Sequence, residues 1–106
     1  MYGIRVTICA AALVAGSSSA FAAGSAAKGK EVFDQCVVCH NADSDEKKIG
    51  PGLKGLFKKD KLTNGKAPND ANVRAKIDEG GNGMPAYKDI LSDQEKADLI
   101  AYLKTL

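Results

Sequence analysis

Tryptophan is absent from this sequence of 106 residues, and its aromatic residues are three tyrosines and three phenylalanines. The charges are nearly balanced, with 15 lysine and arginine residues against 13 aspartate and glutamate residues. Proteins that bind nucleic acid usually combine a basic excess with aromatic side chains on which bases stack. The composition therefore argues against nucleic acid as a partner.

Cysteine and histidine are also scarce, and this limits the kinds of metal site that the chain can build. The sequence has three cysteines, and its single histidine is His40. A structural zinc site needs four ligands, but beyond residue 22 the usual Cys and His donors are only Cys36, Cys39 and His40. A thioredoxin-like dithiol would need a βαβ pattern around the cysteines, and no alternating strand pattern is visible. A dithiol at Cys36 and Cys39 remains an alternative to be tested.

The apolar stretch near the start of the chain, residues 6–16, is shorter than the 20 or so residues needed to span a bilayer. It follows one positive charge at Arg5 and precedes three serines and the pattern Ala20-Phe21-Ala22. This order is typical of a secretory signal peptide. We predict a signal peptide over residues 1–22, including Cys9, and one domain over residues 23–106. No retained transmembrane anchor is expected, and the predicted location is the bacterial periplasm.

Against this background, the run Cys36-Val37-Val38-Cys39-His40 is the most informative feature of the sequence. Cys-x-x-Cys-His is the attachment signature of c-type haem. Two cysteines three residues apart lie on the same side of a helical turn, so both sulfurs can form thioether bonds to the vinyl groups of one porphyrin. The histidine that follows is carried under the ring, where its imidazole can bind the iron. The motif predicts one haem c, covalently attached through Cys36 and Cys39, with His40 as an iron ligand.

Met84 is the only methionine beyond residue 22, and it follows a glycine-rich segment, Gly80-Gly81-Asn82-Gly83. A lone methionine usually fills space in a core. Here the glycines allow the backbone to pass close to a flat ring, and the following Pro85 has no N–H and a fixed φ. We therefore predict that Met84 is the second axial ligand of the iron.

The apolar spacing beyond residue 22 is helical, and it predicts an all-α fold. Helices are expected over about 26–38, over 70–79 and from Ser92 to the end, with one short amphipathic turn over 53–57. Gly80 provides a stop for the middle helix, and Ser92 with Glu95 forms a capping box. Residues 41–52 and 60–69 read as loops, and residues 80–91 as an irregular segment.

With these features placed, the sequence resembles the class I cytochromes c, in particular the small monohaem cytochromes of bacteria. The resemblance covers residues 23–106 and implies a small cytochrome c fold, with three to four helices wrapped around one covalently attached haem. It rests on Gly29, Phe33, the Cys36–His40 motif, Gly50-Pro51-Gly52-Leu53, Gly83-Met84-Pro85 and Leu99-Ile100-Ala101-Tyr102-Leu103.

The resemblance implies that the first and last helices pack together. Gly29 and Phe33 would meet Leu99 and Tyr102, and the missing side chain of Gly29 would allow a close approach.

It also implies roles for two residues that follow the haem motif. The Pro51 carbonyl would accept a hydrogen bond from His40 and so orient it, and Leu53 would pack on the haem face. The absence of tryptophan removes a propionate contact that some members make, for which Tyr87 and the lysines are the candidate replacements.

The resemblance implies an exported single-electron carrier rather than an enzyme, because two protein ligands leave no open iron site for a substrate. The alternative is a peroxidase-like enzyme or ligand sensor in which Met84 leaves the iron. The partners would be redox proteins that donate and accept electrons. Residues 47–66 carry seven lysines against Asp60 alone, which is either an ordinary solvated surface or a basic rim that steers an acidic partner.

Overall fold

The computed structural model describes residues 23–106, so the predictions for the leader and for Cys9 lie outside the described residues. The elements, in chain order, are α1 (Ala26–Phe33), a 3₁₀ helix η1 (Leu56–Lys58), α2 (Asp70–Glu79) and α3 (Asp93–Leu103). Over residues 23–106 the only β pairing is an isolated bridge between Gly81 and Met84. The prediction of an all-α fold is confirmed.

Each α-helix begins at a side chain that satisfies one of the free N–H groups of the first turn. Ser25 accepts from the N–H of Lys28, and Asn69 accepts from the N–H of Asn72. At α3 both hydrogen bonds of the predicted capping box between Ser92 and Glu95 are present. The starts of the helices therefore follow directly from local sequence.

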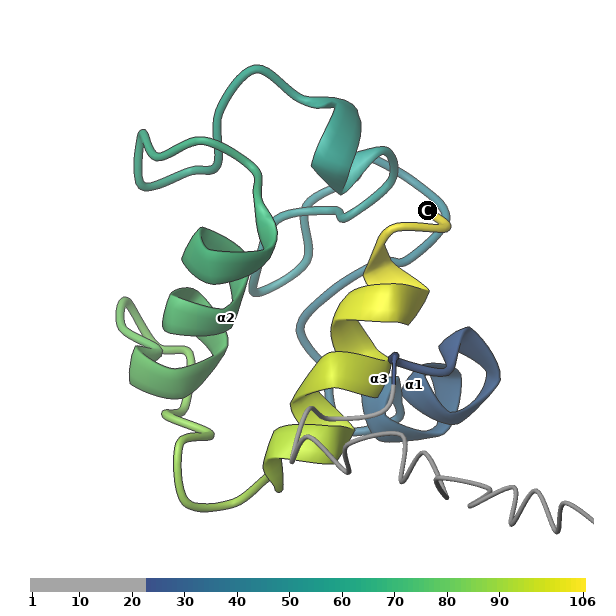
Figure 1. Cartoon of the computed structure of the whole chain (residues 1–106). Helices are drawn as coiled ribbons and strands as arrows, with labels where there is room; N and C mark the ends of the chain where they lie inside the picture. Colours follow the sequence, from purple (N-terminus) through teal and green to yellow (C-terminus); the bar gives the residue numbers. More distant parts are fainter. Residues whose placement is uncertain (1–22) are drawn as a thin grey trace, which may run out of the picture.

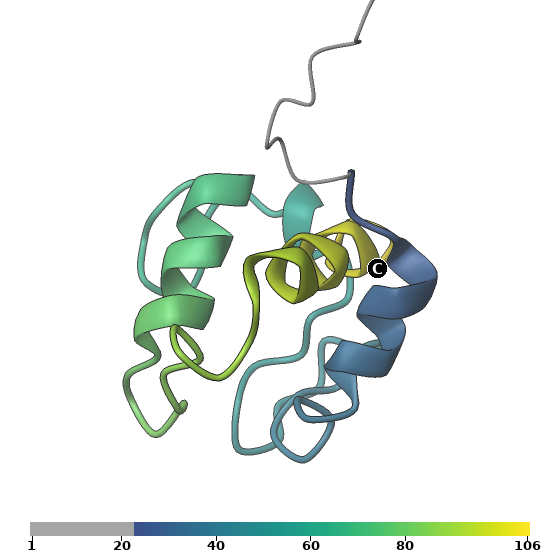
Figure 2. The same cartoon turned by 60° about the horizontal axis from the view of Figure 1, so that its bottom comes forward.

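Helix α3 runs through the middle of the molecule, with α1 on one side of it and α2 on the other (Figures 1 and 2). The predicted packing of α1 on α3 is present. A Cβ atom added to Gly29 would lie 1.9 Å from the carbonyl oxygen of Asp98 and 2.8 Å from the Cβ of Tyr102. The rings of Phe33 and Tyr102 lie 5.3 Å apart between centroids and are tilted by 50°. Only glycine allows this backbone approach.

The buried hydrophobic core is small. It draws on all three α-helices and on one residue of the segment before α3, and no large side chain of residues 23–106 is completely enclosed. Its members are Phe33, Val73, Ile77, Leu91, Leu99, Ile100 and Leu103. Ten further hydrophobic residues pack against this core but remain partly exposed, which leaves a considerable apolar surface in need of a partner.

The expected helix over 26–38 is too long, because α1 ends at Phe33. The backbone N–H groups of Asp34 and Gln35 donate to the carbonyls three residues earlier, at 3.2 and 3.3 Å. This is the pattern of a tightened last turn. Val37 and Val38 are therefore not on the buried face of a helix, and they are 43% and 70% exposed.

The long segment from residue 34 to residue 69 arches over one end of the three α-helices and returns to α2 (Figure 1). The predicted loops over 41–52 and 60–69 both belong to it, as does η1. None of the helices that the structure describes has the length and apolarity to cross a membrane.

Candidate functional site

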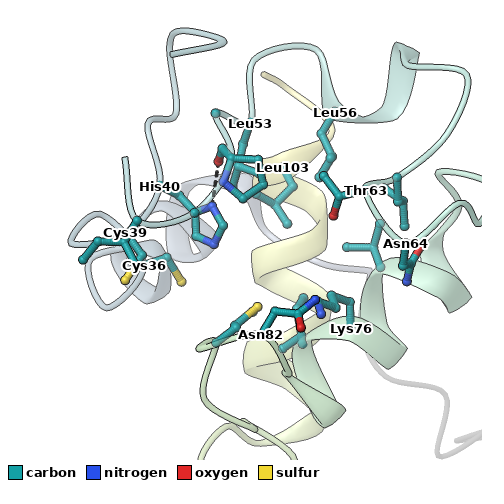
Figure 3. Close-up of a pocket in the computed structure, with 18 of the residues that line it drawn as sticks. Cys36, Cys39, His40, Leu53, Leu56, Thr63, Asn64, Lys76, Asn82 and Leu103 are labelled. Atoms are coloured by element: carbon teal, nitrogen blue, oxygen red, sulfur yellow. Dashed lines mark hydrogen bonds between the residues drawn. The ribbon is translucent and has the colours of Figure 1, made fainter. Parts of the chain in front are cut away.

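The long segment, α2, α3 and the segment before α3 surround an open cavity of about 470 Å³ (Figure 3). Its walls are largely apolar. The hydrophobic side chains among the lining residues are Phe33, Ile49, Leu53, Leu56, Leu62, Val73, Ile77, Met84, Tyr87, Leu99 and Leu103. The structure brings all six predicted site residues to this cavity, namely Cys36, Cys39, His40, Pro51, Leu53 and Met84.

The two cysteines and the histidine are presented together by a compact turn that follows α1. The N–H of Cys36 donates to the carbonyl of Phe33 at 2.7 Å. The Cys36 carbonyl then accepts from the N–H groups of both Cys39 and His40, at 3.1 and 2.9 Å. The three side chains consequently share one side of the cavity, while Lys76 and Asn82 lie on another (Figure 3).

The imidazole of His40 is held by the residue that the sequence indicated. Its Nδ1 atom lies 2.8 Å from the carbonyl oxygen of Pro51. A carbonyl can only accept, so Nδ1 carries the proton in this contact and Nε2 keeps its lone pair. This tautomer leaves Nε2 available as a metal ligand.

Burial raises the pKa of the Cys36 thiol, and the neighbouring Cys39 raises it further. A redox-active dithiol needs the opposite, because its attacking cysteine is activated by a lowered pKa. In the part of the chain that the structure describes, no group of three or more His, Cys, Asp or Glu side chains is placed to hold a metal ion.

Met84 lies at the end of a tight turn that the sequence had indicated only as glycine-rich and irregular. Gly81 and Met84 exchange two backbone hydrogen bonds of 2.9 and 3.1 Å. The two residues between them, Asn82 and Gly83, both have positive φ, 52° and 90°. Positive φ at both central residues is the mark of a type I′ turn, for which Asn-Gly is the preferred sequence. The Asn82-Gly83 dipeptide was the signal in the sequence that could have identified this turn.

Lys96 anchors the chain behind this turn, and the sequence analysis missed its role. Although charged, Lys96 is only 4% exposed. Its Nζ donates to the carbonyl of Lys88 at 3.0 Å and lies 2.7 Å from a carboxylate oxygen of Asp78. It thereby links α3 to α2 and to the segment that follows Met84. The sequence held one hint, because Lys96 falls on the same helical stripe as Leu99, Ile100 and Leu103.

The cavity also has polar groups at its wall. Four lysines, Lys47, Lys59, Lys61 and Lys76, line it together with Gln35, Thr63, Asn64 and Asn82. The cluster of seven lysines over 47–66 is therefore only partly at the cavity. Lys54 and Lys58 do not line it.

The residues present fit a haem group. A wide apolar cavity opens to the surface, two free thiols lie at its wall beside an imidazole with an available Nε2, and a thioether lines the same space. Cationic and amide side chains at the wall can accommodate carboxylate groups.

A family model described as Cytochrome c matches residues 26–106. The chain belongs to the cytochrome c family. It is 37% identical to cytochrome c2 of Blastochloris viridis over 109 residues, which cover 87% of this chain and 86% of that protein. It is 32% identical to cytochrome c2 of Rhodomicrobium vannielii over 122 residues, which cover 99% and 97% of the two chains.

Among solved structures, cytochrome c6 of the diatom Phaeodactylum tricornutum superposes with a TM-score of 0.59 at 28% identity. The match covers 77% of this chain and 93% of that one. The protein is thus a class I c-type cytochrome with the small cytochrome c fold, carrying haem c through Cys36 and Cys39 in electron transport.

Proposed function

We propose that this cytochrome is an exported single-electron carrier in which His40 and Met84 are the axial ligands of the haem iron. One observation supports this most directly: an imidazole with its Nε2 left available and the thioether of Met84 line the same cavity from segments far apart in sequence. Haem iron supplies a reversible one-electron change between the ferrous and ferric states. Two protein ligands would leave no iron position for a substrate, which favours electron transfer over catalysis.

The surrounding residues would hold the two ligands without moving protons. Cys36 and Cys39 fix the group covalently, and Leu53 at the cavity wall provides an apolar contact. The Pro51 carbonyl holds the proton on Nδ1 of His40 and so increases the electron donation of Nε2. A thioether opposite a histidine raises the reduction potential, which suits a carrier that delivers electrons to an oxidase or reductase.

Docking of redox partners would use the surface beside the cysteines. Val38 and Ile49 are 70% and 72% exposed. The Nζ of Lys48 donates to the carbonyl of Val37 at 3.0 Å, so the loop segments that carry these two side chains lie beside each other. Lys47 at the cavity wall adds a positive charge beside them. An apolar patch with a basic border suits brief contact with an acidic partner.

Export would follow from the leader over residues 1–22, with cleavage after Ala22 and delivery to the periplasm. The intact mass of the protein purified from the periplasmic fraction tests this proposal. A mass that includes residues 1–22 would contradict it.

The ligand proposal is tested by Met84→Ala and Met84→His in the haem-loaded protein. Met84→Ala should keep the covalent haem mass, lose the near-infrared sulfur-to-iron absorption band and bind azide or imidazole more readily. Met84→His should lower the reduction potential by a sizeable part of the roughly 0.8 V that axial ligands span. Leu56→Ala, at another cavity-lining position, is the matched control and should keep the absorption band.

An unchanged potential in Met84→His would show that Met84 only fills space. A five-coordinate resting spectrum of the unmodified protein would instead favour the alternative, a peroxidase-like enzyme or ligand sensor in which Met84 is displaced.

A further inference from the structure

Gly50 lies directly against the imidazole ring of His40. A Cβ atom added at Gly50 would lie 2.6 Å from Cε1, 2.9 Å from Nδ1 and 3.1 Å from Nε2 of that ring. Carbon atoms in favourable contact lie about 3.5–4.0 Å apart. Any side chain at Gly50 would therefore have to displace the ring or the backbone.

The backbone at Gly50 has little freedom to withdraw. Its N–H donates to the carbonyl of Cys39 at 2.7 Å, and its own carbonyl accepts from the N–H of Lys48 at 3.0 Å. The next residue, Pro51, holds Nδ1 of the same ring. Gly50 is thus fastened on one side to the peptide that precedes His40 and on the other to the residue that holds its imidazole.

The hydrogen bond to Pro51 does not by itself fix the orientation of the ring, because hydrogen bonds to carbonyl oxygens accept a broad range of directions. A wall on one side of the ring removes much of this freedom. Gly50 provides that wall, because an added Cβ would overlap the ring and a residue with a side chain could not take this place without moving it.

We propose that Gly50 is a positioning residue, whose lack of a side chain sets the rotation of the His40 imidazole about its bond to the iron. The proposal rests on the proposed function, since it requires His40 to be an iron ligand. The orientation of the imidazole plane determines how the unpaired spin of low-spin ferric haem is distributed over the ring methyl groups. Rotation of the plane therefore changes the spread of the methyl proton shifts, which a mere loss of stability does not.

The test is Gly50→Ala in the haem-loaded ferric protein, followed by proton NMR. The φ angle of Gly50 is not in the left-handed region, so alanine there would clash with the ring without straining the backbone. The matched control is Gly55→Ala. Gly55 has φ +66° and no atom within 4 Å of the added Cβ, so alanine there strains the backbone without touching His40.

We expect Gly50→Ala to keep the covalent haem mass and the sulfur-to-iron band while the spread of methyl shifts changes clearly. The reduction potential should rise, because displacing the ring weakens the Nδ1 hydrogen bond and lowers the electron donation of Nε2. Gly55→Ala should lower stability and leave the methyl shifts close to those of the unmodified protein. Unchanged methyl shifts in a haem-loaded Gly50→Ala would overturn the proposal.

If Gly50→Ala does not mature, the ferrous unmodified protein supplies a second test. Nuclear Overhauser contacts between the Gly50 α-protons and the His40 ring protons are expected, and their absence would overturn the proposal. Failure of the proposed function has a different signature, because an unmodified protein without a low-spin His/Met spectrum would reject the ligand assignment itself.

Discussion

His40 and Met84 line the same cavity, but the chain holds them in different ways. His40 is held by residues ten and eleven positions away, through contact with Gly50 and a hydrogen bond to Pro51. Met84 is held locally, by a turn that closes within four residues. The position of His40 therefore depends on how the loop with Gly50 and Pro51 folds back, whereas the position of Met84 depends on the local preference of Asn82-Gly83 for positive φ. We call the cavity walls that carry His40 and Met84 the histidine side and the methionine side.

The two sides also differ in what lies behind them. The histidine side follows directly from α1, which is interlocked with α3 through Gly29. The methionine side is connected to α2 and α3 through Lys96, Asp78 and the backbone of Lys88. A substitution that weakens the contact of α1 with α3 should therefore destabilise the histidine side first, and one that removes Lys96 should destabilise the methionine side first.

The largest effect is expected from removing both attachment points on the histidine side. Cys36→Ala combined with Cys39→Ala should abolish the covalent haem and leave the protein largely unfolded, because seven buried hydrophobic residues around a cavity of about 470 Å³ form a weak core. Mass spectrometry and far-ultraviolet circular dichroism measure the two effects. A compact, haem-free double variant with unchanged helicity would show that haem does not organise the core.

The methionine side can be weakened through Lys96→Met, which removes the buried partner of Asp78. The Asp78 side chain is 24% exposed and keeps Arg74 at 3.9 Å, so we expect a loss of about 2 kcal/mol of unfolding free energy, less than for a fully buried pair, measured by denaturant unfolding of the haem-loaded protein. The sulfur-to-iron band should be lost at a lower denaturant concentration than the helical signal. Lys104→Met is the control, since Lys104 and Asp70 are 47% and 62% exposed, and it should cost at most about 1 kcal/mol.

Equal losses in Lys96→Met and Lys104→Met would mean that Lys96 has no special role. Simultaneous loss of the band and of helicity would mean that the methionine side has no separate weak point.

Helix α1 supports the histidine side, and its contact with α3 includes Asp98, which is 4% exposed. The stability of the protein should therefore depend on pH through Asp98. The backbone N–H of Ser25 and then the side chain of Gln94 hold the pKa of Asp98 below its ordinary value of 3.8, against the opposing effect of burial. The ionised carboxylate thus contributes stability that is fully present above about pH 3.8 and is lost as the pH falls through the lowered value.

Asp98→Asn should therefore lower the thermal unfolding midpoint at neutral pH and converge with the unmodified protein in strong acid. A pH series of unfolding midpoints measures this convergence. A difference that stays constant into strong acid would show that the charge of Asp98 does not contribute.

The smallest expected effect concerns partner docking at the cavity rim. Lys47→Glu with Lys61→Glu should slow second-order electron transfer at low salt, because both lysines line the cavity and a positive field steers an acidic partner. The matched double variant, Lys54→Glu with Lys58→Glu, changes the same charge away from the lining and should slow transfer less. Stopped-flow rates across ionic strength measure the difference, which should fade as the Debye length falls below its physiological value of about 8 Å. A salt slope in both variants equal to that of the unmodified protein would assign all four lysines to solubility.

The sequence alone allowed much of the fold to be predicted, together with the six site residues that line the cavity. Helix starts could be predicted because Ser25, Asn69 and Ser92 each accept from an N–H group only three residues away. The end of α1 could not, because apolar periodicity continues through Val37 while the backbone tightens after Phe33. Periodicity records which residues could be buried, but not where the chain turns.

By itself the sequence determined the chemistry of this protein. The spacing of Cys36, Cys39 and His40 meets the covalent requirements of haem attachment, which act through residue type and local separation. Met84, the one methionine beyond residue 22, is the residue type that the proposed ligation requires. The tertiary structure alone decided how these groups are held. Contact of Gly50 with the His40 ring and burial of Lys96 both depend on segments brought together by packing. Such contacts leave little local signal, because a glycine or a lysine has the same sequence appearance whether it faces solvent or a neighbouring side chain.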